Sequence, residues 1–138
     1  MLHTEHLERH IEILEASVNC IRKAEQDSIR YDVYRNAVVK GFELTLETSG
    51  KLLRKALKPY FATPKEVDVL NFKEVFRYAA KHGILTDDEV ERWFLYRENR
   101  NTTAHDYGES FAEETLALMS DFTNDAKKLV ERLQHAEA

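Results

Sequence analysis

The chain has 138 residues, of which 43% are hydrophobic and 33% are charged, and its formal net charge at pH 7 is −5. This length supports one hydrophobic core, so we expect a single domain over residues 1–138, and the composition excludes a disordered chain. The negative balance excludes binding to nucleic acid through overall charge, and the single cysteine excludes an internal disulfide.

Apolar residues recur every three or four positions, and Gly and Pro are few, which predicts helices. A first helix is expected over about residues 4–27. Its apolar stripe consists of Leu7, Ile11, Leu14, Val18 and Ile21. A second long helix should begin after an N-cap at Ser28 and end at Pro59. Gly41 and Gly50 lie inside it at a cost of about 1 kcal/mol each relative to Ala, so we expect close helix packing at both.

Capping chemistry marks the later boundaries. Helices should open at Thr63, Asn71, Thr86 and Ser110, each followed three positions later by a glutamate. The last of them should carry a stripe of Phe111, Leu116, Met119, Phe122, Ala126, Leu129 and Leu133. These signals predict an all-α, up-and-down antiparallel bundle of about five helices, three of them long.

The candidate chemistry lies at the end of the helix that opens at Thr86, where Arg100 and His105 are close in sequence. A histidine has an ordinary pKa of about 6.5 and can move a proton near neutral pH, and the planar guanidinium of an arginine matches a phosphate. The pair therefore suggests a site for phosphodiesters. On an ideal helix five residues separate the two side chains by roughly 140°, so either the helix breaks between them or they meet across a two-fold dimer interface.

A wider pattern, Arg-Asn-x-x-Ala-His-x-Tyr, is formed by Arg100, Asn101, Ala104, His105 and Tyr107. It resembles the signature of the HEPN superfamily and is similar to its HepT-like branch, also described as nucleotidyltransferase substrate-binding proteins. Residues 41–48, the short helix that ends near His82 and residues 97–100 also resemble this branch. The resemblance covers about residues 5–135.

The resemblance implies a dimeric, all-α endoribonuclease toxin whose antitoxin is a minimal nucleotidyltransferase. It also implies a cleft at the dimer interface and metal-independent cleavage of RNA. In that reaction the 2′-hydroxyl attacks the adjacent phosphorus and leaves a cyclic phosphate and a 5′-hydroxyl. The need for a 2′-hydroxyl excludes DNA as substrate. No metal and no cofactor are expected.

Roles for individual residues follow from the same resemblance. His105 is expected to act as general acid or base, and Arg100 to hold the scissile phosphate. Asn101 and Asp106 would orient these groups or the RNA, and Arg97 would assist on the phosphate side. These five residues form the predicted catalytic and RNA-binding set.

Tyr107 is the expected target of silencing, because partner enzymes of this kind can transfer AMP to the tyrosine of the motif. The added nucleotide would lie two residues from His105. Its bulk and its negative charge would both oppose RNA binding.

Two other functions remain open. The chain could be a non-catalytic subunit that binds nucleotide or substrate for a nucleotidyltransferase, or a purely structural helical dimer. At the level of residues, Arg100 and His105 could simply stabilise the negative end of a helix dipole, and Tyr107 could be a capping aromatic. Arg97 could form a salt bridge with a neighbouring glutamate, either Glu98 or Glu91.

The remaining features have simpler interpretations. A basic stripe consists of Lys51, Arg54, Lys55 and Lys58; it is either a solvated face or a contact for RNA. His6 and His10 should lie on an exposed helix face, and Cys20 should be a buried, inert thiol. Trp93 and Phe94 should pack in the bundle or at a dimer seam. The chain lacks an apolar run of the ~20 residues that span a bilayer and lacks a signal-peptide pattern, so we expect a cytoplasmic protein with no membrane partner.

Overall fold

The structure, a computed structural model, describes residues 2–103 and 111–136. These residues form six α-helices: α1 (Glu5–Lys23), α2 (Ile29–Leu57), α3 (Pro64–Asp68), α4 (Phe72–Lys81), α5 (Asp87–Thr103) and α6 (Leu116–Ala136). A 3-10 turn (Lys58–Tyr60) follows α2, and a π-helical turn (Phe111–Thr115) precedes α6. The predicted all-α bundle is confirmed. It has six helices where about five were expected, and the five-residue α3 follows the predicted capping box at Thr63.

Helix starts follow the capping residues. Ser28 accepts a hydrogen bond from the Tyr31 N–H at 3.0 Å, and Asn71 and Glu74 form a reciprocal capping box with distances of 2.9 and 3.0 Å. The end of α1 differs from the prediction, because the chain becomes extended at Ala24, with φ −90° and ψ 147°. A turn in which the Ser28 N–H donates to the Glu25 carbonyl then leads into α2. The predicted start at Ser110 lies outside the described residues.

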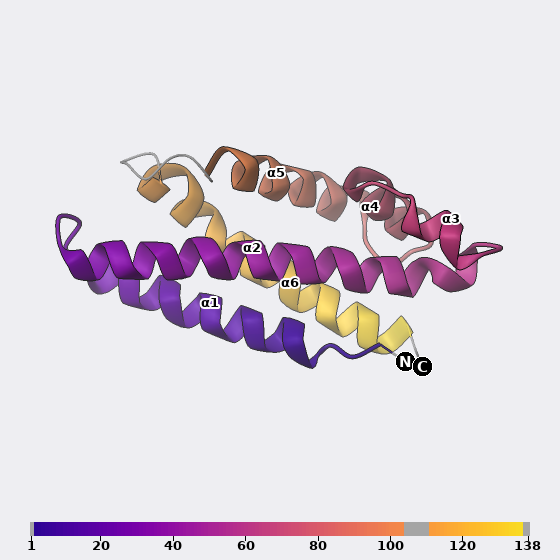
Figure 1. Cartoon of the computed structure of the whole chain (residues 1–138), viewed down its shortest axis with the longest axis horizontal. Coiled ribbons are helices and arrows are strands. Elements are labelled where there is room, and N and C mark those ends of the chain that lie inside the picture. The colour runs from indigo at the N-terminus through magenta and orange to yellow at the C-terminus, as the bar shows by residue number, and fades with distance from the viewer. Residues whose placement is uncertain (1, 104–110, 137–138) are drawn as a thin grey trace.

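The long helix α2 organises the bundle. It runs the length of the molecule, with α1 along one side, α3, α4 and α5 along the other, and α6 crossing behind it (Figure 1). It contacts α1, α4, α5 and α6, and α1 also packs on α6. Within the described ranges, no helix is both long and apolar enough to cross a membrane.

Two glycines of α2 have different surroundings. A Cβ built on Gly41 would lie 3.3 Å from Leu14 Cδ1 and 3.5 Å from Leu14 Cα, so α1 packs closely on α2 at this glycine, as predicted. A Cβ on Gly50 would meet only the Phe72 ring, at an ordinary 3.9 Å. The prediction of close packing is therefore wrong for Gly50.

Two further predictions concern burial. Trp93 is fully buried inside the bundle, with its ring centroid 5.6 Å from that of Phe122. Phe94 is half-buried, with the Lys73 ammonium over its ring. Cys20 is exposed, so the prediction of a buried thiol is wrong. Its neighbour Ile21 is buried in the core, whereas Cys20 lies outside the buried stripe of α1.

A buried polar network joins α5 to α6. Asp125 accepts two hydrogen bonds from the Arg92 guanidinium, at 2.9 and 3.0 Å, and one from the Tyr96 hydroxyl at 2.5 Å. Burial raises the pKa of Asp125, but the hydrogen bonds from Arg92 and Tyr96 outweigh burial and leave this pKa below its ordinary value. Burial, followed by the bond to Asp125, raises the pKa of Tyr96.

A second link lies at the start of α5. Glu89 closes a capping box with Thr86 and also pairs with Arg132 of α6. Burial raises the pKa of Glu89, but the hydrogen bonds from Arg132 and Thr86 prevail and lower it. The two links fix the rotation of α5 on α6 and thereby decide which of its side chains face α2 and α4.

Candidate functional site

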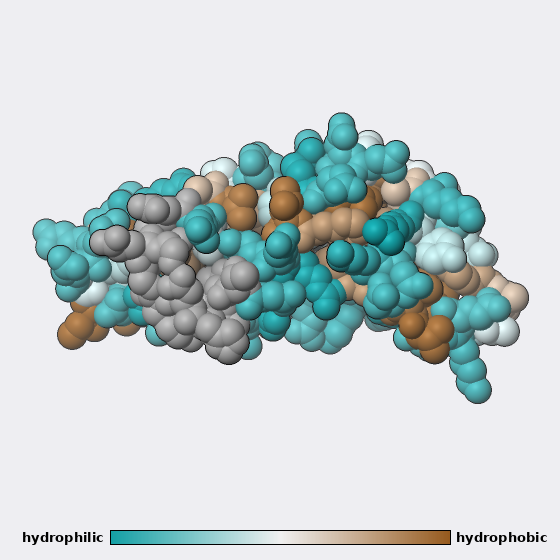
Figure 2. All heavy atoms as spheres, turned by 90° about the horizontal axis from the view of Figure 1, so that it is seen from above, coloured by the Kyte–Doolittle hydropathy of each residue, from teal (hydrophilic) through white to brown (hydrophobic). Residues whose placement is uncertain are grey.

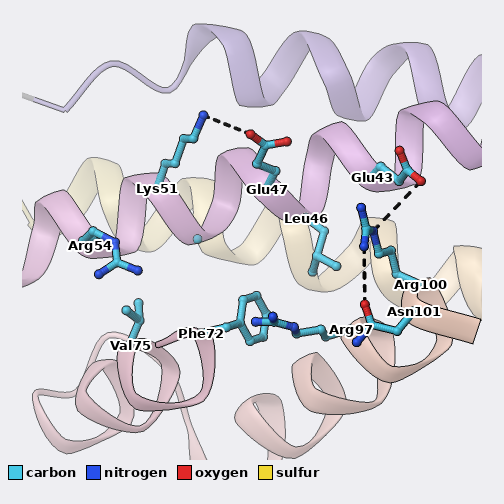
Figure 3. A pocket seen from close by; sticks show the side chains of 11 residues that line it. Glu43, Leu46, Glu47, Lys51, Arg54, Phe72, Val75, Arg97, Arg100 and Asn101 are labelled. Carbon is cyan, nitrogen blue, oxygen red and sulfur yellow. Dashed lines mark hydrogen bonds and ion pairs between the residues drawn. The ribbon is translucent and has the colours of Figure 1, made fainter. Parts of the chain in front are cut away.

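The end of α5 carries three of the predicted site residues, Arg97, Arg100 and Asn101. All three line a pocket between α2, α4 and α5 with a cavity volume of about 430 Å³ (Figure 3). Such a volume is within the range of small-molecule sites. The face formed by α4 and α5 is mostly hydrophilic, with hydrophobic side chains showing in its central part (Figure 2). The sequence therefore brings one half of the predicted set together in a real depression of the surface.

Arg100 lies in the last turn of α5, where a cation also favours the helix dipole. Its Nε is 4.0 Å from Glu43 Oε1, and its Nη1 donates to Asn101 Oδ1 at 3.4 Å. The first distance is longer than a hydrogen bond, and a guanidinium has five N–H donors. Arg100 is thus positioned by its neighbours and retains donors for an anion.

Arg97 points along the pocket towards α4 (Figure 3). Its guanidinium carbon lies over the Phe72 ring, 4.4 Å from the ring centroid. A cation over an aromatic face is attracted by about 0.5–1 kcal/mol at exposed sites. In the described part of the chain, the contact shown for the Arg97 guanidinium is therefore with Phe72 of α4.

Of the remaining lining residues, only Lys51 and Arg54 belong to a predicted feature, the basic stripe. From α2 and α4 they are Glu43, Leu46, Glu47, Gly50, Lys51, Arg54, Phe72 and Val75. The α2 members recur at spacings of three and four, which places them on one helix face beside the core stripe. That spacing was the available signal, but only the packing of α4 and α5 shows that the face borders a pocket.

Part of the predicted basic stripe already has partners. Lys51 pairs with Glu47 at 3.0 Å, and the hydrogen bond from Lys51 lowers the pKa of Glu47. Arg54 donates to the Val67 carbonyl at 2.6 Å. Lys55 is exposed and does not line the pocket.

His105, Asp106 and Tyr107, the other predicted site residues, lie outside the described residues, so their part of the motif stays a prediction. The geometry on the described side is an all-α bundle with two arginines and an amide converging at the end of one helix. The chain is thus a helical bundle whose described pocket lining combines four cationic side chains with two carboxylates.

Sequence comparison identifies the family. The profile of the family described as "Nucleotidyltransferase substrate binding protein like" matches residues 2–135. The chain belongs to this family, within the HepT-like branch of the HEPN superfamily that its motif resembles.

Relatives agree with this assignment. The chain is 28% identical over 109 residues to a protein of Haemophilus influenzae named "Probable ribonuclease HepT", covering 79% of this chain and 73% of the relative. A solved Haemophilus influenzae structure, described as the fold of a substrate binding domain of a nucleotidyltransferase, superposes with a TM-score of 0.80 at 25% identity, covering 96% of this chain and 99% of that one. A structure of the MntA–HepT toxin–antitoxin superposes with a TM-score of 0.67 at 12% identity, over 95% and 98% of the two chains, and shows the fold alone.

Proposed function

We propose that this protein is a metal-independent endoribonuclease and the toxin of a toxin–antitoxin pair. The observation that carries the proposal is the convergence of Arg97, Arg100 and Asn101 on one pocket, directly before the segment that holds His105. In a chain with a net charge of −5, such a cationic end of one helix favours a local phosphate contact. Membership of the HepT-like branch and the ribonuclease name of a relative support the same activity.

The proposed reaction is an intramolecular transesterification at one phosphodiester of the RNA. The 2′-oxygen forms a bond to phosphorus, the bond from phosphorus to the 5′-oxygen breaks, and a cyclic phosphate and a 5′-hydroxyl result. His105 takes the 2′-hydroxyl proton or supplies the proton to the leaving oxygen. Arg100 binds the non-bridging oxygens as charge builds on them, and Asn101 and Asp106 hold these groups in position. A homodimer would place two His105 side chains in one cleft, one for each proton transfer.

The proposed partner is a minimal nucleotidyltransferase antitoxin. The family description and the fold shared with a toxin–antitoxin structure support this pairing. AMP transfer to Tyr107 would silence the enzyme, because it adds bulk and negative charge two residues from His105. A Tyr107→Phe variant should escape this modification. If the partner silences that variant fully, transfer to Tyr107 is not the mechanism.

A second function has its own support. The family description, and the relative described as a substrate binding domain, favour a non-catalytic subunit that binds nucleotide or substrate for the transferase. The two functions differ in one respect. Partner binding without any RNA cleavage would favour the subunit, whereas cleavage that needs His105 favours the nuclease.

The deciding experiment is RNA cleavage by the purified chain in excess EDTA. His105→Ala should lower the rate by about 10²–10⁴-fold, the usual contribution of a general acid or base, and Arg100→Ala should lower it as well. Arg9→Ala is the matched control, because Arg9 is an exposed arginine of α1 that pairs with Glu12 and does not line the pocket. Intact mass must show Tyr107 unmodified. If wild-type protein with unmodified Tyr107 does not cleave RNA, the second function, a non-catalytic subunit, is favoured.

A further inference from the structure

Gly50 is the first observation, because helix packing does not explain it. The residue is in the interior of α2, where glycine weakens a helix, and the nearest atoms to an added Cβ are 3.9 Å away. A methyl group would fit there without displacing any neighbour. What it would occupy is the pocket, which Gly50 lines opposite Phe72.

Arg97 offers the second observation. One face of its guanidinium is covered by the Phe72 ring at 4.4 Å, and the group extends along the pocket (Figure 3). Guanidinium planes and aromatic rings are the surfaces on which proteins stack the unpaired bases of RNA. Leu46 and Val75 add apolar wall on the α2 and α4 sides. The cavity of about 430 Å³ is large enough for one nucleotide.

The carboxylate of Glu43 provides the third observation. It is half-buried at the pocket wall, and its contact with Arg100 is 4.0 Å long, so no hydrogen bond reaches it from residues 2–103 or 111–136. The other carboxylate of the pocket, Glu47, is already paired with Lys51. A planar carboxylate with free lone pairs accepts two parallel N–H bonds, and among RNA bases guanine presents two on one edge, at N1 and N2.

We propose that this pocket binds one nucleotide of a single RNA strand, with guanine as the preferred base. The base stacks on the free face of Arg97 against Gly50, its N1 and N2 donate to Glu43, and its phosphate lies at Arg100. The proposal deepens the proposed function, on which it rests for the ligand being RNA. It makes the pocket the place where a cleavage site is selected by its neighbouring base.

The test is calorimetric titration, in EDTA, of the full chain with the 3′-monophosphates of guanosine, adenosine, cytidine and uridine. Guanosine 3′-monophosphate should bind at least tenfold more tightly than the uridine compound. Gly50→Leu should weaken it at least tenfold, and Gly50→Ala by a smaller factor. Asn36→Leu is the matched control, since Asn36 is an exposed residue of α2 that does not line the pocket. Thermal unfolding checks the fold, and Gly50→Ala should raise the melting temperature while it weakens binding.

Glu43→Gln separates recognition of the base from recognition of the phosphate. It should lower affinity for the guanosine compound about tenfold and leave the adenosine compound unchanged, because an amide cannot accept both N–H bonds. Equal affinity for all four compounds, absence of binding at millimolar concentration, or a Gly50→Leu variant that binds like wild type would overturn the proposal. These readouts do not involve cleavage. Binding that depends on the pocket, in a protein without nuclease activity, would contradict only the proposed function. Nuclease activity that Gly50→Leu leaves unchanged would contradict only the proposed guanine site.

Discussion

The two halves of α5 treat their charged groups differently. In the first half, Arg92 and Tyr96 donate three hydrogen bonds of 2.5 to 3.0 Å to the buried Asp125. In the second half, Arg100 Nε is 4.0 Å from Glu43 Oε1, and Arg97 lies over the Phe72 ring. The same helix therefore holds a buried carboxylate's three hydrogen-bond donors at close range from two residues, followed within one turn by cations whose described partners are a more distant carboxylate and an aromatic ring.

This difference separates a structural role from a binding role. A buried polar group with every partner in place is stable and has nothing left to offer a ligand. An arginine whose partners are distant keeps donors for a phosphate. The first half of α5 also orients the second, because Tyr96 is one residue before Arg97 and is held by α6. Substitutions in the first half should change stability, and those in the second should change binding.

The largest expected effect comes from Asp125→Ala. It removes the common acceptor and leaves Arg92 and Tyr96 without a partner inside the bundle. We expect a loss of about 2–3 kcal/mol in the free energy of unfolding, less than for a fully buried pair because Arg92 is 39% exposed. Urea unfolding measures it, with Asp121→Ala as an exposed control on the same helix. A loss below 1 kcal/mol would contradict the structural role of the network.

Acid should weaken the same network. The pKa of Asp125 is lowered in the folded state, so the unfolded state takes up the proton first as pH falls. The stabilisation is therefore present at neutral pH, starts to be lost near the unfolded-state pKa of about 3.9, and disappears as pH passes below the folded pKa. In Asp125→Asn the free energy of unfolding should vary less between pH 5 and 3 than in wild type. Equal acid dependence in both proteins would show that another carboxylate dominates.

The two glycines sharpen the comparison at a smaller scale. Gly41→Ala gains about 1 kcal/mol in helix propensity but crowds Leu14, at a cost of about 1–3 kcal/mol, so a net loss near 1 kcal/mol is expected. Gly50→Ala has the same gain without the cost and should stabilise the chain by up to about 1 kcal/mol. Urea midpoints measure both. Destabilisation by Gly50→Ala would remove the argument that Gly50 is kept for a ligand.

Helix starts could be predicted because capping is local. Ser28 and Asn71 bind backbone groups three residues away, so the sequence contains both partners side by side. The end of α1 was placed too late because neither Gly nor Pro marks the extended residue Ala24. Arg97, Arg100 and Asn101 could also be grouped from the sequence, because they lie close together on one helix.

The pocket and the network could not be predicted, because their partners come from different helices. Asp125 lies 29 residues from Tyr96, and Phe72 lies 25 positions before Arg97 in the chain. One signal was present: Asp125 is a charged residue on the apolar stripe of the last helix, between Phe122 and Leu129. A charge on such a stripe indicates a buried partner. It does not identify which helix supplies that partner.

The smallest expected effect tests whether a cation with a partner contributes to RNA binding. The test uses a His105→Ala background, in which RNA should stay uncut. In that background Arg100→Ala should reduce the slope of log K against log salt concentration by about 0.7, the value for one phosphate of a single strand. Lys51→Ala should change the slope by much less, because Lys51 is paired with Glu47 at 3.0 Å. Both variants lose one positive charge, so overall charge cannot explain a difference between them. Equal slopes would mean that RNA binding depends on the total charge of this face. The difference between Lys51, with its carboxylate at 3.0 Å, and Arg100, with its carboxylate at 4.0 Å, would then not affect binding.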